Sequence, residues 1–182
     1  MANRRKAGWF ALAALLLACG CAAAPPPTAE PAPETRVIAG VPFLAQEGET
    51  CGPSSLAMLL RFHGIAADPR ELADETRIEG LSGALITDLA AAARRRGLAA
   101  EVTDLDLAGL RRLIVAGEPA VLLLDLGTWP FTRQHYLIVY GVTAEGVVAH
   151  SGSTEALLIP FGRLERQWGK MGRLAIVAAR RQ

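Results

Sequence analysis

Cys51 and His135 are the two residues whose types could together carry out nucleophilic chemistry. Cys51 stands directly before an apolar segment with helical spacing, in which Leu56, Leu59 and Leu60 form one stripe. A thiol at a helix N-terminus is favoured as the thiolate, because the positive end of the helix dipole lowers its pKa from about 8.5. The pattern therefore indicates a nucleophile at Cys51, and a buried, inert thiol is the structural alternative.

The start and the end of this helix have their own signals. Pro53 suits the first helical position, because its missing N–H would have no partner there in any case. Gly64 provides the end of the helix. The Cys-Gly-Pro run therefore predicts a helix that begins at Pro53 and holds the thiol at its tip.

A base must take the proton from such a thiol, and histidine has the pKa for that task. The chain has three histidines. His63 lies about twelve residues after Cys51, or roughly 18 Å along the helix, so we interpret it as a helix C-terminal residue. His135 begins a predicted strand, and a thiol on a helix tip facing an imidazole on a sheet is the arrangement of papain-like enzymes. A partnerless strand-edge residue is the alternative for His135.

The elements that must position these residues are mostly helices first and antiparallel strands second. The two apolar runs on either side of Thr143-Ala-Glu145 predict an antiparallel hairpin. This order predicts an α+β fold, with an N-terminal helical half packed on a C-terminal antiparallel sheet. The predicted helices cover residues 53–63, 69–76, 84–96, 107–116 and 161–168, and the predicted strands cover 98–103, 120–125, 134–142, 146–150, 156–159 and 174–179.

The amino terminus predicts export and lipid attachment. Residues 1–21 begin with a positive patch and continue in an apolar run too short to span a bilayer. The run ends in small residues before a cysteine, which resembles the lipobox of bacterial lipoproteins, where the cysteine is lipidated. Cys19 fits best because Leu16 lies three residues ahead, and Cys21 is the alternative. A plain secretory signal with two incidental cysteines is the other interpretation.

The rest of the chain divides into a tether and one domain. Residues 22–36 are rich in proline and alanine and predict an extended spacer. Residues 37–182, roughly 145 residues, are enough for an independent core. We therefore expect a monomer in the cell envelope, held at the membrane by an N-terminal lipid anchor and facing the periplasm or the exterior.

Composition excludes several classes of partner. The formal net charge is +1, which provides no basic face for nucleic acid. The domain's one cysteine and three histidines lack the local spacing of metal ligands, and no nucleotide-binding loop is present, so we expect no metal and no cofactor. Cys51 is the domain's single cysteine. In an oxidising compartment a structural cysteine usually has a partner, so the unpaired one indicates reactivity.

Three motifs together resemble the papain-like bacteriocin-processing (double-glycine leader) cysteine peptidases, family thirty-nine of the cysteine peptidases, and look closest to its free-standing lipoprotein members. The motifs are Val41-Pro-Phe-Leu-Ala-Gln46, Cys51-Gly-Pro-Ser-Ser-Leu-Ala-Met-Leu-Leu and His135-Tyr-Leu-Ile-Val-Tyr-Gly141. The resemblance spans the globular part. It implies a papain-like fold, a peptide or protein substrate, Cys51 as nucleophile and His135 as general base and acid.

The resemblance also implies that Gln46 is a side-chain donor of the oxyanion hole, beside the backbone N–H of Cys51. Such a donor is worth roughly 10²–10³ in rate in known cases. Gln46 lies one residue nearer to Cys51 than is common in the family, so the intervening turn must adjust. The alternative is a Gln46 that only solvates a loop.

The third catalytic residue is where this chain departs from the family pattern. Family members usually place an aspartate on the strand after the histidine, to orient the imidazole. The corresponding stretch here is residues 148–152, and no aspartate follows Asp125. His150 is the first substitute, because a neutral imidazole nitrogen can accept from the N–H of His135; Ser151 or a backbone carbonyl could do the same, and His150 as a plain hairpin residue is the alternative. A neutral group stabilises imidazolium less than a carboxylate does, so we expect a weak enzyme or a lost one.

Three function hypotheses follow. The first is an exported, lipid-anchored cysteine peptidase that cleaves peptide bonds through Cys51 and His135. The second is a catalytically weak or inactive papain-like module that binds peptides at the membrane. The third, a cell-wall amidase, fits the Cys-Gly-Pro motif poorly. Leader-processing members are usually fused to a transporter and act on the cytoplasmic side, so we do not extend their substrate to this chain. We interpret Trp129, Phe131 and Trp168 as packing residues rather than as the lining of a cleft.

Overall fold

The structure is a computed structural model that describes residues 35–46, 50–78 and 83–180. The described residues all belong to one compact unit, Ala32–Gln182. The predicted signal, the candidate lipidation sites Cys19 and Cys21, and nearly all of the tether lie outside the described residues. Among the described helices, none has the length and apolar character needed to cross a bilayer.

The described part of the chain forms one antiparallel sheet of seven strands with five helices. Its elements are β1 (Arg36–Val37), α1 (Cys51–Phe62), α2 (Pro69–Thr76), α3 (Ile86–Arg95), β2 (Leu98–Asp104), α4 (Leu107–Val115), β3 (Ala120–Asp125), β4 (Gln134–Val142), β5 (Gly146–Ser151), β6 (Thr154–Pro160), α5 (Phe161–Gly169) and β7 (Leu174–Arg180). The strand order is β2-β7-β3-β4-β5-β6, and β1 pairs with β4. The predicted α+β fold and the predicted hairpin of residues 134–142 and 146–150 are confirmed.

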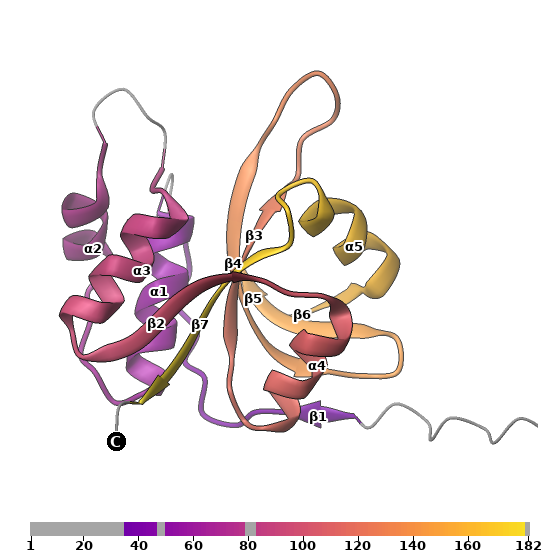
Figure 1. Cartoon of the computed structure of the whole chain (residues 1–182), viewed down its shortest axis with the longest axis horizontal. Helices are drawn as coiled ribbons and strands as arrows, with labels where there is room; N and C mark the ends of the chain where they lie inside the picture. Colours follow the sequence, from indigo (N-terminus) through magenta and orange to yellow (C-terminus); the bar gives the residue numbers. More distant parts are fainter. Residues whose placement is uncertain (1–34, 47–49, 79–82, 181–182) are drawn as a thin grey trace, which may run out of the picture. The chain divides into compact units, whose positions relative to one another are not determined.

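Helices cover both faces of the sheet (Figure 1). Along β3, Val121 and Leu123 belong to the core under α1, α2 and α3, whereas the alternate residues belong to a second core under α4 and α5. Because side chains alternate between the two faces of a strand, covering both faces demands a continuous apolar run, and β3 has one. The helical half predicted from the sequence is therefore one of two helical layers.

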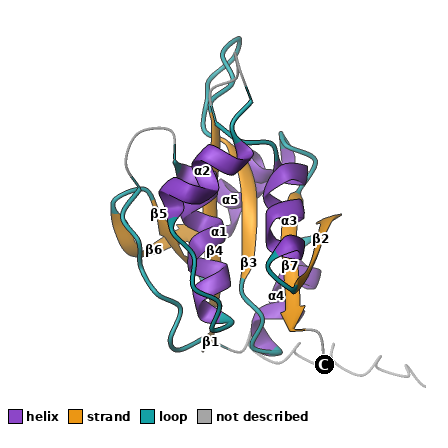
Figure 2. Ribbon diagram, turned by 90° about the vertical axis from the view of Figure 1, so that its left-hand side faces the viewer, coloured by secondary structure: helices purple, strands orange, loops and turns teal. Residues whose placement is uncertain are grey.

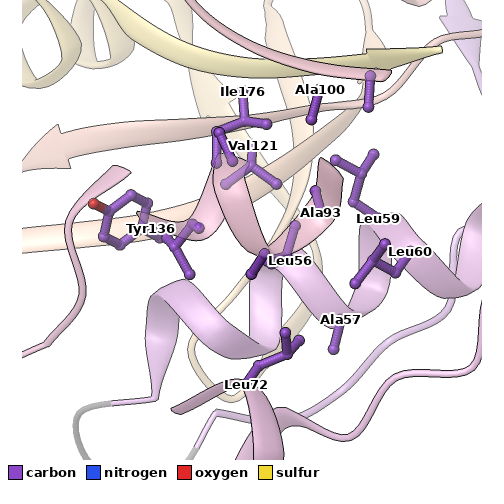
Figure 3. Packing of buried hydrophobic residues seen from close by; sticks show 14 of the residues in the cluster. Leu56, Ala57, Leu59, Leu60, Leu72, Ala93, Ala100, Val121, Tyr136 and Ile176 are labelled. Atoms are coloured by element: carbon purple, nitrogen blue, oxygen red, sulfur yellow. The ribbon is translucent and has the colours of Figure 1, made fainter. Parts of the chain in front are cut away.

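Helix α1 is the central helix of its layer and is buried on all sides. Every residue from Gly52 to Leu60 is buried, not only the predicted leucine stripe. Figure 3 shows its side chains between Leu72 of α2 and the sheet residues Val121 and Ile176. A helix that is enclosed in this way has little freedom to shift, so the residue at its N-terminus is held in place.

The start of α1 differs from the prediction. The helix begins at Cys51 itself rather than at Pro53, and the first bond of the helix runs from Ser54 N–H to the Thr50 carbonyl. Pro53 still fits, because the N–H groups of the first turn have no partner within the helix. The predicted end is confirmed: Gly64 has a positive φ of 74°, which suits glycine.

The hairpin of β4 and β5 contains a register shift. Val139 pairs with Ala149, and Gly141 pairs with Val148, so Tyr140 is an extra residue on β4. A bulge of this kind changes the faces to which the following side chains point. It lies between the position of His135 and the end of the strand, and it affects which β5 residue can meet the imidazole.

Candidate active site

Cys51 lies at the N-terminus of α1 and is a half-buried, free thiol. The next residue, Gly52, packs against Leu89 of α3 and Tyr136 of β4: a Cβ at this position would lie 2.9 Å from Leu89 Cδ1 and 3.1 Å from Tyr136 Cδ2. A side chain here would require both neighbours to shift, so the glycine allows the helix tip to approach the strand closely. Because Tyr136 follows His135 in the chain, this contact brings the thiol-bearing end of α1 to the end of β4 that holds the imidazole.

His135 lies near the end of the sheet, one residue after the Asp125–Gln134 pair that closes β3 on β4. Its Nε2 atom is 2.8 Å from Ser151 Oγ, at the end of β5. The hydroxyl therefore orients the ring and leaves Nδ1 as the nitrogen available for proton transfer. Among the described residues, no hydrogen bond joins Cys51 and His135.

The environment of His135 favours the neutral imidazole. Burial lowers its pKa below the ordinary value of 6.5, and the positive charge of Arg133 lowers the pKa further. A neutral imidazole at pH 7 can accept a proton, which a general base must do. The same environment stabilises an imidazolium poorly once it has formed, and a hydroxyl partner offsets this less than a carboxylate would.

Gln46 is held between α1 and the turn that follows Ser151. Its Nε2 donates to Ser55 Oγ at 3.2 Å, and its Oε1 accepts from Gly152 N–H at 3.0 Å. Its own backbone N–H donates to the Gly152 carbonyl, also at 3.0 Å. These contacts place the amide one helical turn from Cys51, with one of its two N–H donors used by Ser55. The alternative for Gln46, a side chain that only solvates a loop, does not fit these contacts.

The contacts of His150 differ from the expectation that it orients His135. Its Nδ1 accepts from Ala156 N–H at 3.2 Å, so Nε2 carries the proton and donates to the Val41 carbonyl at 3.2 Å. The ring is buried and packs against Phe43 and Tyr140, at centroid distances of 5.3 and 4.3 Å. Both ring nitrogens are therefore used on backbone groups, and the group that meets His135 is Ser151, which the sequence offered only as an alternative.

These contacts predict that His150 supports stability rather than chemistry. Replacing His150 by alanine should lower the free energy of unfolding by about 2–4 kcal/mol, because it opens a cavity and leaves two backbone groups without partners. The rate of Cys51 alkylation in the folded protein should stay unchanged. Urea unfolding and iodoacetamide labelling measure the two effects. If His150→Ala kept its stability but lost the reactivity of Cys51, His150 would instead have a role in catalysis.

His63 and three aromatic residues are the remaining candidates from the sequence. His63 caps the C-terminal end of α1, as predicted, and its Nε2 lies 4.0 Å from Glu118 Oε2. Trp168 is a packing residue, as interpreted from the sequence: it is fully buried and donates to the Leu174 carbonyl. Trp129 and Phe131 are not packing residues, because their exposed fractions are 94% and 77%.

The sequence profile of the peptidase C39 family matches residues 41–180, which include Gln46, Cys51, His135 and Ser151. The chain belongs to the peptidase C39 family. It is therefore related to cysteine peptidases, and the resemblance seen in the three motifs is confirmed. No curated protein matches the sequence.

Solved structures of C39 peptidases share the fold. A C39-like peptidase from Bacillus anthracis is 21% identical, with a TM-score of 0.67, covering 82% of this chain and 99% of that one. The peptidase domain of Streptococcus ComA, a bifunctional ABC transporter involved in quorum sensing, is 19% identical, with a TM-score of 0.63 and coverage of 78% and 100%. A double-glycine-motif protease from an AMS/PCAT transporter, in complex with the leader peptide, is 19% identical, with a TM-score of 0.59 and coverage of 80% and 97%. The papain-like C39 fold is thus the fold of this domain.

Proposed function

We propose that this protein is a cysteine peptidase in which Cys51 attacks a peptide carbonyl and His135 carries the proton. In this mechanism the imidazole takes the thiol proton as the sulfur bonds to the carbonyl carbon, and it then gives that proton to the leaving amine. Water, deprotonated by the same imidazole, hydrolyses the resulting thioester and releases the second product. Each step uses Nδ1 of His135, because Nε2 is held by Ser151.

The single observation that carries this proposal is the close packing of Gly52 on Tyr136. It joins the helix tip that bears the thiol to the strand end that bears the imidazole. Cys51 stands at the N-terminus of α1, and the neutral His135 is ready to accept its proton. A buried structural cysteine would need none of these neighbours.

The negative oxygen that forms on the substrate needs donors, and we infer that Gln46 and the backbone N–H of Cys51 provide them. The Gln46 amide keeps one N–H beyond the bond to Ser55. Because its carbonyl end is fixed by Gly152, the amide is oriented before a substrate binds. Donors that are oriented in advance stabilise the transition state without a reorganisation cost.

We further infer that the substrate is a peptide and that the protein acts from a lipid anchor. A leader peptide is bound in the structure of one relative, the AMS/PCAT transporter protease, which supports a peptide as the ligand class. Anchoring at Cys19 or Cys21, with residues 22–36 as the spacer, would place the domain at a membrane surface in the cell envelope. These inferences about location depend on the sequence signals alone.

The neutral partner of His135 supports a second candidate, a module that binds peptides and cleaves them slowly or not at all. A hydroxyl at 2.8 Å orients the ring but adds no negative charge beside it. This candidate shares the peptide-binding surface with the first and differs from it only in turnover.

The deciding experiment is peptide cleavage with a matched thiol variant. The purified full chain is incubated with a mixed library of synthetic decapeptides, and mass spectrometry identifies new peptide ends. We expect cleavage products that are absent with Cys51→Ala, together with a thioester-linked fragment on Cys51 at short times. If wild type and Cys51→Ala give the same products, the peptidase proposal fails. Peptides that bind both proteins without cleavage would then favour the binding module.

A further inference from the structure

The loop between β3 and β4, residues 126–133, carries the two most exposed large apolar side chains in the described part of the chain. Trp129 is 94% exposed and Phe131 is 77% exposed, whereas the next, Val37, is 48% exposed. A single exposed apolar residue is ordinary, but two exposed aromatic side chains in one short loop form a patch that usually marks an interaction site. Sequence reasoning assigned both to packing, and neither packs within the domain.

Hydrogen bonds at its base hold this loop in a defined shape. One carboxylate oxygen of Asp125 accepts from Gly127 N–H at 2.7 Å and from Arg133 N–H at 2.9 Å. Leu126 N–H donates to the Arg133 carbonyl, and Lys170 Nζ donates to the Gly127 carbonyl. A loop that is already ordered loses little conformational entropy when it binds a ligand. The aromatic pair is therefore presented on a fixed platform.

The loop adjoins the proposed active site. It runs directly into His135, with one residue between Arg133 and the imidazole, and the charge of Arg133 reaches that ring. Figures 1 and 2 show the loop projecting at the end of the domain opposite to β1, the strand with which the described part of the chain begins. A ligand on the loop would therefore lie beside the proposed catalytic residues and at the end of the domain opposite to β1. Both facts favour a substrate over a bilayer as the occupant.

We propose that Trp129 and Phe131 select substrates by seating one apolar side chain of the peptide beside the scissile bond. This inference rests on the proposed peptidase function for its occupant. The two aromatic rings provide apolar contact area without a charged or hydrogen-bonding group of their own, apart from the indole N–H. They therefore distinguish an apolar side chain from a small polar one, and they tolerate differences among apolar side chains.

The test compares the full-length wild type with the double variant Trp129→Ser/Phe131→Ser. The substrates are internally quenched decapeptides in which one position at a time is either leucine or serine. At one position the wild type should prefer leucine by about tenfold or more in kcat/KM, and the double variant should lose that preference. Val115→Ser, which replaces an exposed apolar residue of α4, is the matched control and should keep the preference.

Two further measurements separate the possible failures. Iodoacetamide is too small to need the loop, so it should label Cys51 equally fast in wild type and double variant. The same peptides are also titrated into Cys51→Ala, with and without the two serines, so that binding is measured without catalysis. Loss of binding in the serine variant supports the loop even if no wild-type cleavage is found. An unchanged leucine preference in both cleavage and binding overturns the loop inference and leaves the peptidase proposal intact.

A bilayer as the occupant is a distinct outcome. Vesicles of phosphatidylcholine and phosphatidylglycerol with brominated acyl chains quench a tryptophan that enters the membrane. Quenching that is lost in Trp129→Phe, together with an unchanged leucine preference in the double variant, would assign the loop to lipid and would overturn the inference. No quenching difference between wild type and Trp129→Phe agrees with a peptide occupant.

Discussion

Replacing His135 by alanine is expected to lower the rate of peptide cleavage at least about 10³-fold and to slow the alkylation of Cys51 near pH 6. In the proposed mechanism the imidazole takes the thiol proton, and no other histidine of the described chain is placed to do so: His63 lies at the far end of α1, and His150 is held by two backbone groups. The measurements are kcat/KM on the best library peptide and the second-order rate of iodoacetamide labelling.

His63→Gln is the matched control for this prediction. It removes a histidine from the same helix as Cys51, at the opposite terminus, and should leave the labelling rate close to that of wild type. Thermal melting of each variant ensures that folded proteins are compared. Equal labelling of His135→Ala and wild type across pH 5 to 8 would show that the imidazole does not act on the thiol, and the peptidase proposal would lose its base.

Replacing Ser151 by aspartate is expected to raise the rate. The hydroxyl oxygen of Ser151 lies 2.8 Å from Nε2 of His135, so a carboxylate there could accept the same bond. An opposite charge at this distance raises a histidine pKa by about 1–3 units, against the lowering that burial and Arg133 now cause. Because one pKa unit corresponds to a factor of ten, the population of the thiolate–imidazolium pair, and with it the cleavage rate, should increase about tenfold to a thousandfold.

The same substitution should also shift the pH dependence of the rate in one direction. The aspartate raises the pKa of His135, so the imidazolium persists to higher pH. The alkaline limb of the pH–rate profile should therefore move to higher pH. Ser151→Asn is the matched control, because it can accept the same hydrogen bond without a charge, and its profile should resemble that of wild type. If the asparagine and aspartate variants give equal rates, negative charge is not what this site lacks.

Most of the fold could be predicted from the sequence, because the local signals agree with one another. The apolar spacing after Cys51, the proline after Asp68 and the paired runs around Thr143 each indicate one element, and each element is present. What the spacing could not show is that α1 is buried on all sides. The leucine stripe accounts for one face, and the other faces are covered by α2 and α3, whose placement depends on tertiary contacts.

The candidate site was only partly predictable for a similar reason. Residue types pointed to Cys51, His135 and Gln46, but the partner of the imidazole depends on strand register. A shift of one residue exchanges the faces of a strand, and the extra residue Tyr140 produces such a shift. His150 therefore points to the Val41 carbonyl, and its neighbour Ser151 meets the ring. A sequence pattern alone carries no sign of where a bulge will fall.

The exposure of Trp129 and Phe131 was the clearest failure of sequence reasoning. Aromatic residues usually pack, as Trp168 does, and composition cannot distinguish the two cases. The distinguishing feature is Asp125. Its carboxylate accepts hydrogen bonds from both sides of the loop, at Gly127 N–H and Arg133 N–H, and so holds together the base of the loop that carries the aromatic side chains. An acidic residue at the end of a strand, followed by glycine two residues later, was the available signal.

The two-way contact between Gln46 and Gly152 has a consequence for inhibition. Because the segment before the nucleophile is bonded to the turn just after Ser151, the proposed oxyanion donor and the partner of the imidazole are parts of one junction. A small molecule wedged into that junction would displace both at once without reacting with the sulfur. Such compounds would need no electrophile.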